Sequence, residues 1–207
     1  MNRTDAEMIK FLTQSENVPC VLEIIQHSDE IQMSLFQGFW RRVRDALEKA
    51  RPKGISEADL RLDFRAFNRQ FGGVNGFLAD TNSTGQKLFY TVEHLVWNHG
   101  TGIELYFGLH WNRQVKDASD LLKIPELARL KAAQEKGGFV FDDNPWWFGW
   151  KYLEEQHPRP VDFLMELHAN SESWIKRISD SFWQLVHATR GSVLEVNGIL
   201  LTKTAKD

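Results

Sequence analysis

Large apolar residues recur at helical spacing near the start of the chain and again near its end. Five of them between positions 36 and 47 are separated by three, one, three and four positions, which places them on one helix face. We therefore expect helices over residues 4–14 and 19–50, the second broken near residues 27–29. Similar spacing predicts a short helix over 161–168 and a long one from residue 171. The five residues are Phe36, Phe39, Trp40, Val43 and Leu47.

A third helix is predicted after residue 56. Residues 56–59 form a capping-box pattern, with Asp59 in the place of the usual Glu. Apolar residues then follow at intervals of four, three and four up to Phe71, where Gly72 and Gly73 would end the helix. Because residues 72–86 are rich in Gly, Asn, Ser and Thr, we expect them to form a long loop.

The hydrophobic period changes in the middle of the chain. Residues 88–97 are rich in aromatic and β-branched types, and residues 103–111 alternate between apolar and polar, which predicts a β-hairpin. A helix over 119–136 that Pro125 can split, a possible strand at 139–141 and an extended segment over 145–153 would follow. Residues 193–201 suit either more helix or a short strand. This order predicts the α+β class.

We expect one domain over 1–207, with a helical part (1–72), a β-meander with an inserted helix (86–153) and a C-terminal helical part (160–201). Its 207 residues are 42% apolar and 26% charged, which is typical of a globular protein. The single cysteine is typical of a reducing compartment, and no signal-peptide pattern or apolar run of about 20 residues occurs. We therefore predict a cytoplasmic protein without a membrane partner.

Motifs for familiar chemistry are missing from the sequence. It contains no phosphate-binding glycine loop, no Gly-x-Ser-x-Gly elbow, no Cys-x-x-Cys pair and no His-Glu-x-x-His. We accordingly assign no catalytic residue, no metal ligand and no cofactor.

A basic segment is the first candidate surface. Residues 38–71 carry nine Lys or Arg residues against five Asp or Glu residues, a net charge of +4 in a chain whose total is −3. Arg61, Arg65 and Arg69 are four positions apart and would line one edge of the predicted helix, where they could follow nucleic-acid phosphates. The alternative is a solvated helix face, since acids such as Asp63 lie between them.

The polar side of the hairpin is the second candidate surface. If paired residues have numbers that sum to about 200, Tyr90 opposes His110 and His94 opposes Tyr106. Two imidazoles, a carboxylate and two phenols would then surround Gly108 and could bind a ligand or transfer protons. A slip of one residue would scramble this pairing, and the alternative is a sheet face half covered by a helix. The set is Tyr90, His94, Glu104, Tyr106 and His110.

Two other features of the strands are unusual. Glu93 falls on the same parity as Leu95 and Trp97. Three of the eight tryptophans, Trp146, Trp147 and Trp150, lie within five residues. Alternation would place Trp146 and Trp150 on one side of the extended segment and Trp147 on the other. Such a cluster could be core, a subunit interface or an aromatic platform for a base or peptide.

The run from Asp143 to Leu153 also carries a family resemblance. The sequence DNPWWFGWKYL, followed by a short and a long helix, resembles the C-terminal accessory region of a bacterial PD-(D/E)xK nuclease-superfamily group. The catalytic Asp and Glu-x-Lys of that family have no counterpart, because no Asp or Glu is followed two positions later by Lys. The resemblance implies an accessory module standing alone, and it implies no nuclease activity.

These observations favour a non-catalytic binding or regulatory module. Its partner would be a nucleic acid, contacted through Arg61, Arg65 and Arg69, or a protein, in a bacterial or phage defence system. One alternative is a small metal- or His-dependent enzyme that uses the polar side of the hairpin. Another is a homo-oligomeric structural protein whose tryptophans lie between subunits.

Overall fold

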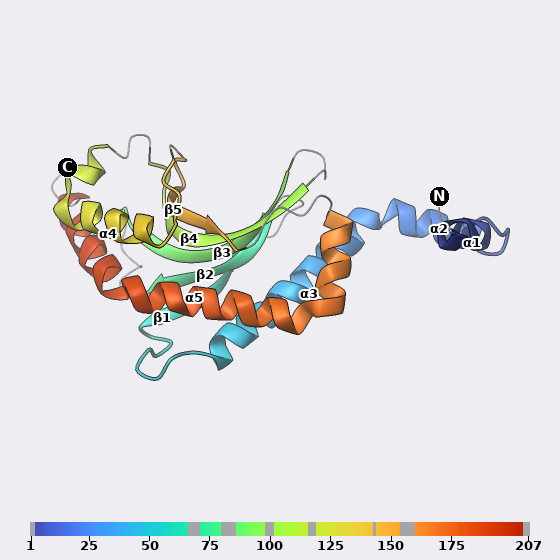
Figure 1. The fold of residues 1–207 in the computed structure, drawn as a ribbon, viewed down its shortest axis with the longest axis horizontal. Helices are drawn as coiled ribbons and strands as arrows, with labels where there is room; N and C mark the ends of the chain where they lie inside the picture. The colour runs from blue at the N-terminus through green and yellow to red at the C-terminus, as the bar shows by residue number, and fades with distance from the viewer. Residues whose placement is uncertain are drawn as a thin grey trace.

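The computed structural model describes residues 3–65, 71–79, 86–97, 102–115, 119–142, 144–153 and 160–204. Helices precede and follow a five-stranded antiparallel sheet with strand order β1-β2-β3-β4-β5 (Figure 1). The α+β class and the predicted order of helices, meander and helices are therefore confirmed. The helices are α1 (Arg3–Leu12), α2 (Val18–Gln26), α3 (Ser28–Lys49), α4 (Pro125–Lys136) and α5 (Pro160–Thr204). The strands are β1 (Leu60–Arg65), β2 (Phe71–Leu78), β3 (Leu88–Trp97), β4 (Gly102–Trp111) and β5 (Trp147–Tyr152).

The helical periodicity of the first fifty residues predicts the structure well. A break at His27 separates α2 from α3, as expected. All five residues of the predicted apolar face of α3 are buried, and they pack against α5 and the sheet. Burying several large apolar side chains on one face supplies most of the stability of such a helix.

The predicted helix after residue 56 is wrong. Residues 60–65 form β1 and residues 71–78 form β2, and the two strands pair antiparallel from Leu60 opposite Leu78 to Arg65 opposite Gly73. An apolar interval of four fits one helix face, but it also fits one face of a strand because four is a multiple of two. Leu62 is buried between the exposed Arg61 and Asp63, and this alternation is typical of a strand and not of a helix. The helical part thus ends at Lys49, and β2 occupies residues 72–78 of the predicted loop.

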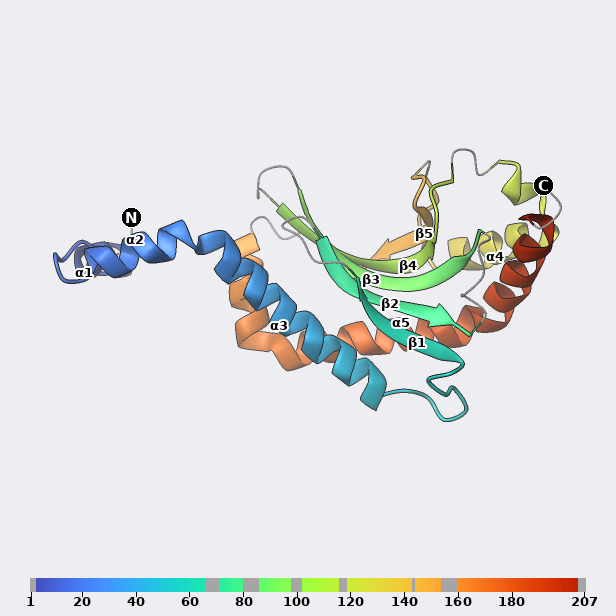
Figure 2. The same cartoon turned by 180° about the vertical axis from the view of Figure 1, so that it is seen from behind.

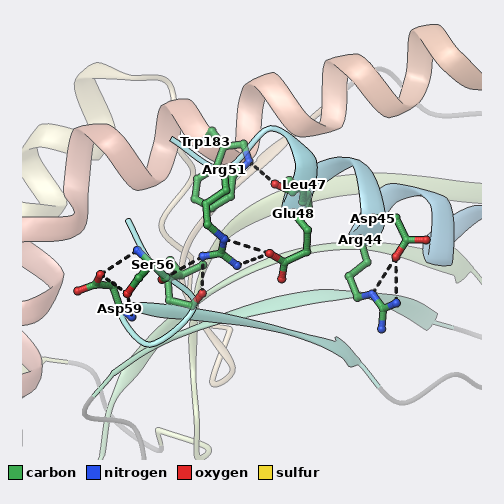
Figure 3. Close-up of polar contacts among 9 residues, drawn as sticks. Arg44, Asp45, Leu47, Glu48, Arg51, Ser56, Asp59 and Trp183 are labelled. Carbon is green, nitrogen blue, oxygen red and sulfur yellow. Dashed lines mark hydrogen bonds and ion pairs between the residues drawn. The ribbon is translucent and has the colours of Figure 1, made fainter. Parts of the chain in front are cut away.

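The capping-box residues do interact, but they close a turn in front of β1. The Ser56 amide donates to a carboxylate oxygen of Asp59 at 2.8 Å, and the Asp59 amide donates back to the Ser56 hydroxyl at 3.2 Å. Arg51 stabilises the same connection (Figure 3). Its guanidinium donates hydrogen bonds to the carbonyl oxygens of Ser56 and Leu60 and to the carboxylate of Glu48. These contacts turn the chain from α3 into the sheet.

The C-terminal third is more helical than predicted. The two expected helices form one helix, α5, with a kink at Asn170, whose φ and ψ are −126° and 26°. Residues 193–201 continue this helix, which passes through Gly191 without a break. Pro125 separates a short 3-10 turn (Leu121–Lys123) from α4, and Val140 contributes one isolated bridge to Trp150. Within the described residues, none of the helices has the length and apolar character needed to cross a bilayer.

Candidate functional site

The two faces of the sheet have different surroundings. Helices α3 and α5 run along one face in both views, whereas no described helix covers the other, towards which the strands curve (Figures 1 and 2). We call these the helix face and the concave face. Cross-strand pairing assigns each residue to one of them; Arg65, Glu93, Tyr106, His110 and Trp147 are among those on the concave face.

Two glycines permit the curvature. A Cβ atom added to Gly73 would overlap the carbonyl oxygen of Val92, and one added to Gly108 would overlap the carbonyl oxygen of Gly149. Both glycines are on the concave face, because Gly73 pairs with Glu93 and Gly108 pairs with Thr91. Glycines at such positions are a common means of bending a sheet, which explains why a glycine-rich segment forms β2 instead of a loop.

The hairpin is confirmed, but its predicted register is wrong by one residue. Leu88 pairs with Trp111, so paired residues have numbers that sum to 199, and Tyr90 opposes Leu109 while His94 opposes Leu105. A shift of one residue moves a strand's side chains to the other face. Tyr90 and His94 therefore lie on the helix face, away from Glu104, Tyr106 and His110.

On the helix face, Tyr90 and His94 have structural partners. The Tyr90 hydroxyl lies 3.1 Å from the hydroxyl of Thr189 in α5, and the indole of Trp40 in α3 donates to Nδ1 of His94 at 2.7 Å. The ring of Phe36 stacks on His94 with centroids 4.4 Å apart. Burial lowers the pKa of His94 to about 3, and a backbone hydrogen bond with Gly72 acts in the opposite direction. We therefore remove both residues from the candidate site.

The charged centre of the concave face is Glu93, which sequence reasoning noted only as an oddity. Glu93 is 3% exposed, forms an ion pair with Arg65 of β1 and accepts a hydrogen bond from Tyr106 of β4. Burial raises the pKa of Glu93 to about 7, although Arg65 and Tyr106 both favour the carboxylate. Burial, reinforced by Glu93, also raises the pKa of Tyr106. Glu93 is thus a buried group that can change protonation near neutral pH.

Aromatic residues of β5 surround this pair. The rings of Trp147 and Trp150 lie 5.2 and 6.1 Å from the ring of Tyr106, each edge to face. The Tyr152 hydroxyl, whose residue was not among the predicted site residues, donates to Glu104 at 3.0 Å. Tyr152 lies opposite Tyr106 in the β4–β5 register, so a correct pairing of these strands would have found it.

The predicted alternation of the tryptophans is wrong because β4 and β5 contain an irregularity. Leu109 pairs with Gly149 but His110 pairs with Trp147, a shift that leaves one extra residue on β5. Phe148 consequently packs on Trp111 and Phe141 in the core, while Trp147 joins Trp150 beside Tyr106. Trp147 is 6% exposed and Trp146 is 45% exposed.

His110 is the most unusual residue of the concave face. Its Nδ1 lies 2.6 Å from the carbonyl oxygen of Trp111, and because a carbonyl only accepts, Nδ1 carries the proton. Burial, with a contribution from Arg65, lowers the pKa of His110 to about 3, so the ring is neutral and Nε2 is an acceptor. This Nε2 is buried and has no hydrogen-bond partner among the described residues. The rings of Phe89, Trp146 and Trp147 surround the imidazole at 5.0, 6.0 and 5.1 Å.

The predicted arginine stripe lies on a strand, not on a helix. Arg61 and Arg65 share the concave face because they are four positions apart in β1; Arg69 lies outside the described residues. Arg61 pairs with Asp63 at 3.0 Å and packs over Phe77, and Arg65 pairs with Glu93 and packs over Phe71. Acidic partners thus already neutralise both arginines.

Six predicted residues from three separate surfaces therefore meet on one face of the sheet. They are Arg65, Tyr106, His110, Trp146, Trp147 and Trp150, with Arg61 and Glu104 at the margins. The described residues contain no group of three or more His, Cys, Asp or Glu side chains placed to hold a metal ion. Of the set proposed for a His-dependent enzyme, only Glu104, Tyr106 and His110 share a face.

Comparison with known proteins adds no family to this geometry. No protein-family model matches the chain, and no curated protein or solved structure matches it either. The resemblance to the nuclease accessory region accordingly stays a prediction from one aromatic run and the order of the elements.

Proposed function

We propose that the chain is a non-catalytic binding module whose concave face binds a small, flat, uncharged ligand that donates a hydrogen bond to His110. The observation that supports this most directly is Nε2 of His110, a buried acceptor without a partner among the described residues. A buried acceptor left unpaired costs about 1–3 kcal/mol, which a ligand N–H or O–H would relieve. Adenine, cytosine and guanine have this chemistry, because each has an exocyclic amine that donates and a planar ring.

The aromatic surroundings favour a flat ligand. Trp146 stacks on the imidazole with an angle of 27° between the ring planes, and it is the most exposed tryptophan of the cluster. If this indole moves away from the imidazole, a planar ring can enter between the two and stack on Trp146. Stacking of a base on an aromatic side chain is worth about 1–3 kcal/mol and tolerates different bases.

The charges of the face favour an uncharged ligand over a phosphate. Arg61 and Arg65 each have an acidic partner, and Glu104 adds another carboxylate to the same face. A phosphate would have to displace these partners before it could contact a guanidinium. We therefore expect a nucleoside to bind at least as tightly as the corresponding nucleotide.

Titration of the intrinsic tryptophan fluorescence with adenosine, cytidine, guanosine and adenosine monophosphate tests this proposal. We expect saturable quenching by at least one nucleoside, and at least a tenfold weaker affinity in His110→Phe, which keeps a ring but removes the acceptor. Trp146→Ala should also weaken binding, because it removes the stacking indole. His187→Ala is the matched control, since His187 is exposed on α5.

Three outcomes would contradict the proposal. One is an absence of saturable binding by any of the nucleosides. The second is unchanged affinity in His110→Phe, provided that its circular dichroism spectrum matches the parent spectrum. The third is binding by adenosine monophosphate alone, which would favour phosphate recognition by the arginines.

A further inference from the structure

The N-terminal arm, which we define as residues 6–35, exposes an unusual amount of apolar surface. Nine of the thirteen exposed large apolar side chains of the described residues lie in it. Helix α2 contains no buried residue, and α1 and α2 extend beyond the sheet in both views (Figures 1 and 2). The nine are Met8, Ile9, Phe11, Val18, Leu22, Ile24, Ile25, Ile31 and Leu35.

The apolar pattern of the arm is ordered along its helices. Val18, Leu22 and Ile25 are four and three positions apart and form one stripe of α2. On α3, Ile31 and Leu35 continue the row of the buried Phe39 at intervals of four, but they are 42% and 55% exposed where the helix passes beyond the sheet. The stripe that forms the core farther along α3 therefore continues into the arm, where its side chains are exposed.

We propose that this arm is an interface with a second copy of the same chain, in which two arms pack antiparallel about a two-fold axis. The exposed fractions of the nine side chains correspond to on the order of 800 Å² per chain, which is what one partner contributes to an interface of standard size. A two-fold arrangement is closed and makes the same contacts twice. This interface is independent of the ligand proposed for the concave face.

The distribution of charge along the arm specifies the antiparallel direction. Residues 13–30 contain Glu16, Glu23, Asp29 and Glu30 and no Lys or Arg, whereas residues 41–44 contain three arginines and no acid. Arg41 and Arg42 are exposed. An antiparallel pair centred near residue 29 places Glu16, at the tip of each arm, beside Arg41 and Arg42 of the other chain, while Asp29 and Glu30 of both chains lie near the axis. A parallel pair would place acid against acid and base against base.

Sedimentation equilibrium of the full chain is the first experiment. We expect a dimer, and at least a tenfold weaker association in Leu22→Lys/Ile25→Lys, which places charge on the apolar stripe. Val140→Lys is the matched control, because Val140 is 43% exposed between α4 and β5, at the end of the molecule away from the arm (Figure 1). A parent chain that stays monomeric at 100 μM, or a double variant that dimerises like the parent, would overturn the proposal.

Charge exchange tests the direction. Glu16→Arg/Glu23→Arg and Arg41→Glu/Arg42→Glu should each weaken self-association, because each places like charges together at both ends. An equimolar mixture of the two variants should recover association. In the mixed pair, residues 16 and 23 of each chain lie near residues 41 and 42 of opposite charge in the other chain. Failure of the mixture to associate more tightly than either variant alone would contradict the antiparallel arrangement.

The single cysteine gives a direct distance. Cys20 is exposed on α2, so a nitroxide label attached to it needs no further substitution. With the axis near residue 29 and a rise of 1.5 Å per residue, the two labels should be roughly 25–30 Å apart by double electron–electron resonance. A distance below about 15 Å would indicate a parallel pair and overturn the proposed geometry.

Discussion

Each face of the sheet buries a histidine, and the two imidazoles differ in what their nitrogens contact. On the helix face, Nδ1 of His94 accepts from Trp40 and the ring also bonds to the backbone of Gly72. On the concave face, Nδ1 of His110 donates to Trp111 but Nε2 has no partner among the described residues. Burial lowers the pKa of both to about 3, so their charge does not distinguish them.

The two faces of the sheet also differ in the buried polar and charged groups that they contain. On the helix face the two polar residues of β3 have partners, Tyr90 with Thr189 and His94 with Trp40, whereas Gln134 and Ser179 in the covering helices have buried polar atoms without one among the described residues. The concave face instead contains a buried ion pair and an unpaired acceptor beneath aromatic rings. A buried ion pair and a buried unpaired acceptor cost stability, and on the concave face they lie together beneath rings that include the exposed Trp146, which favours a use in binding.

The largest expected difference between the faces is in the cost of removing a tryptophan. Trp40→Ala should lower the free energy of unfolding by about 3–5 kcal/mol, because it leaves a large cavity and removes the donor to His94. Trp146→Ala should cost less than about 1.5 kcal/mol, since that indole is 45% exposed. Urea denaturation of both variants measures this. Equal costs would show that the two faces contribute alike to the core.

The second largest difference is expected in how the free energy of unfolding depends on pH, because Glu93 lies on the concave face. The pKa of Glu93 is about 7 in the folded chain and 4.5 ordinarily, so the unfolded chain releases this proton first as pH rises. Glu93 should therefore lower stability progressively between pH 4.5 and pH 7, by about 3 kcal/mol in total, with no further change above. The difference in unfolding free energy between the parent and Glu93→Gln, measured from pH 4 to pH 9, reports it. A difference independent of pH would contradict the shifted pKa.

Local patterns predicted the helices at both ends of the chain and the central hairpin, because the face of such an element is determined by spacing within one segment. The concave face could be predicted only in part, because it depends on pairing between segments. One residue of register moved Tyr90 and His94 to the helix face, and one irregularity in β5 brought Trp147 beside Trp150. The partnership of Glu93 with Arg65 spans two strand pairs and required β1, which the spacing had assigned to a helix.

The two histidines give a smaller contrast. His94→Leu leaves the indole N–H of Trp40 buried and unpaired, so we expect a loss of about 1–3 kcal/mol. His110→Leu removes one hydrogen bond but also an unpaired acceptor, and its effect on stability should be less than about 1 kcal/mol. Paired thermal and urea denaturation curves measure both. A His110→Leu variant less stable than His94→Leu would show that His110 is mainly a structural residue.

The smallest effect on stability is expected from the ion pair of Arg61. Arg61 and Arg65 are both arginines on the concave face, but Arg61 is the more exposed of the two. Its side chain is 57% exposed and pairs with Asp63, which is 51% exposed, whereas the partner of Arg65 is the buried Glu93. An exposed ion pair is screened by water and salt, so a double-mutant cycle of Arg61→Ala and Asp63→Ala should give a coupling of less than about 0.5 kcal/mol. Arg65→Ala should cost several times more at pH 8, because it leaves the Glu93 carboxylate buried without its cation. Equal effects at Arg61 and Arg65 would mean that the charged centre of the concave face is as solvated as its margin, and that the ion pair gives this face no distinct chemistry.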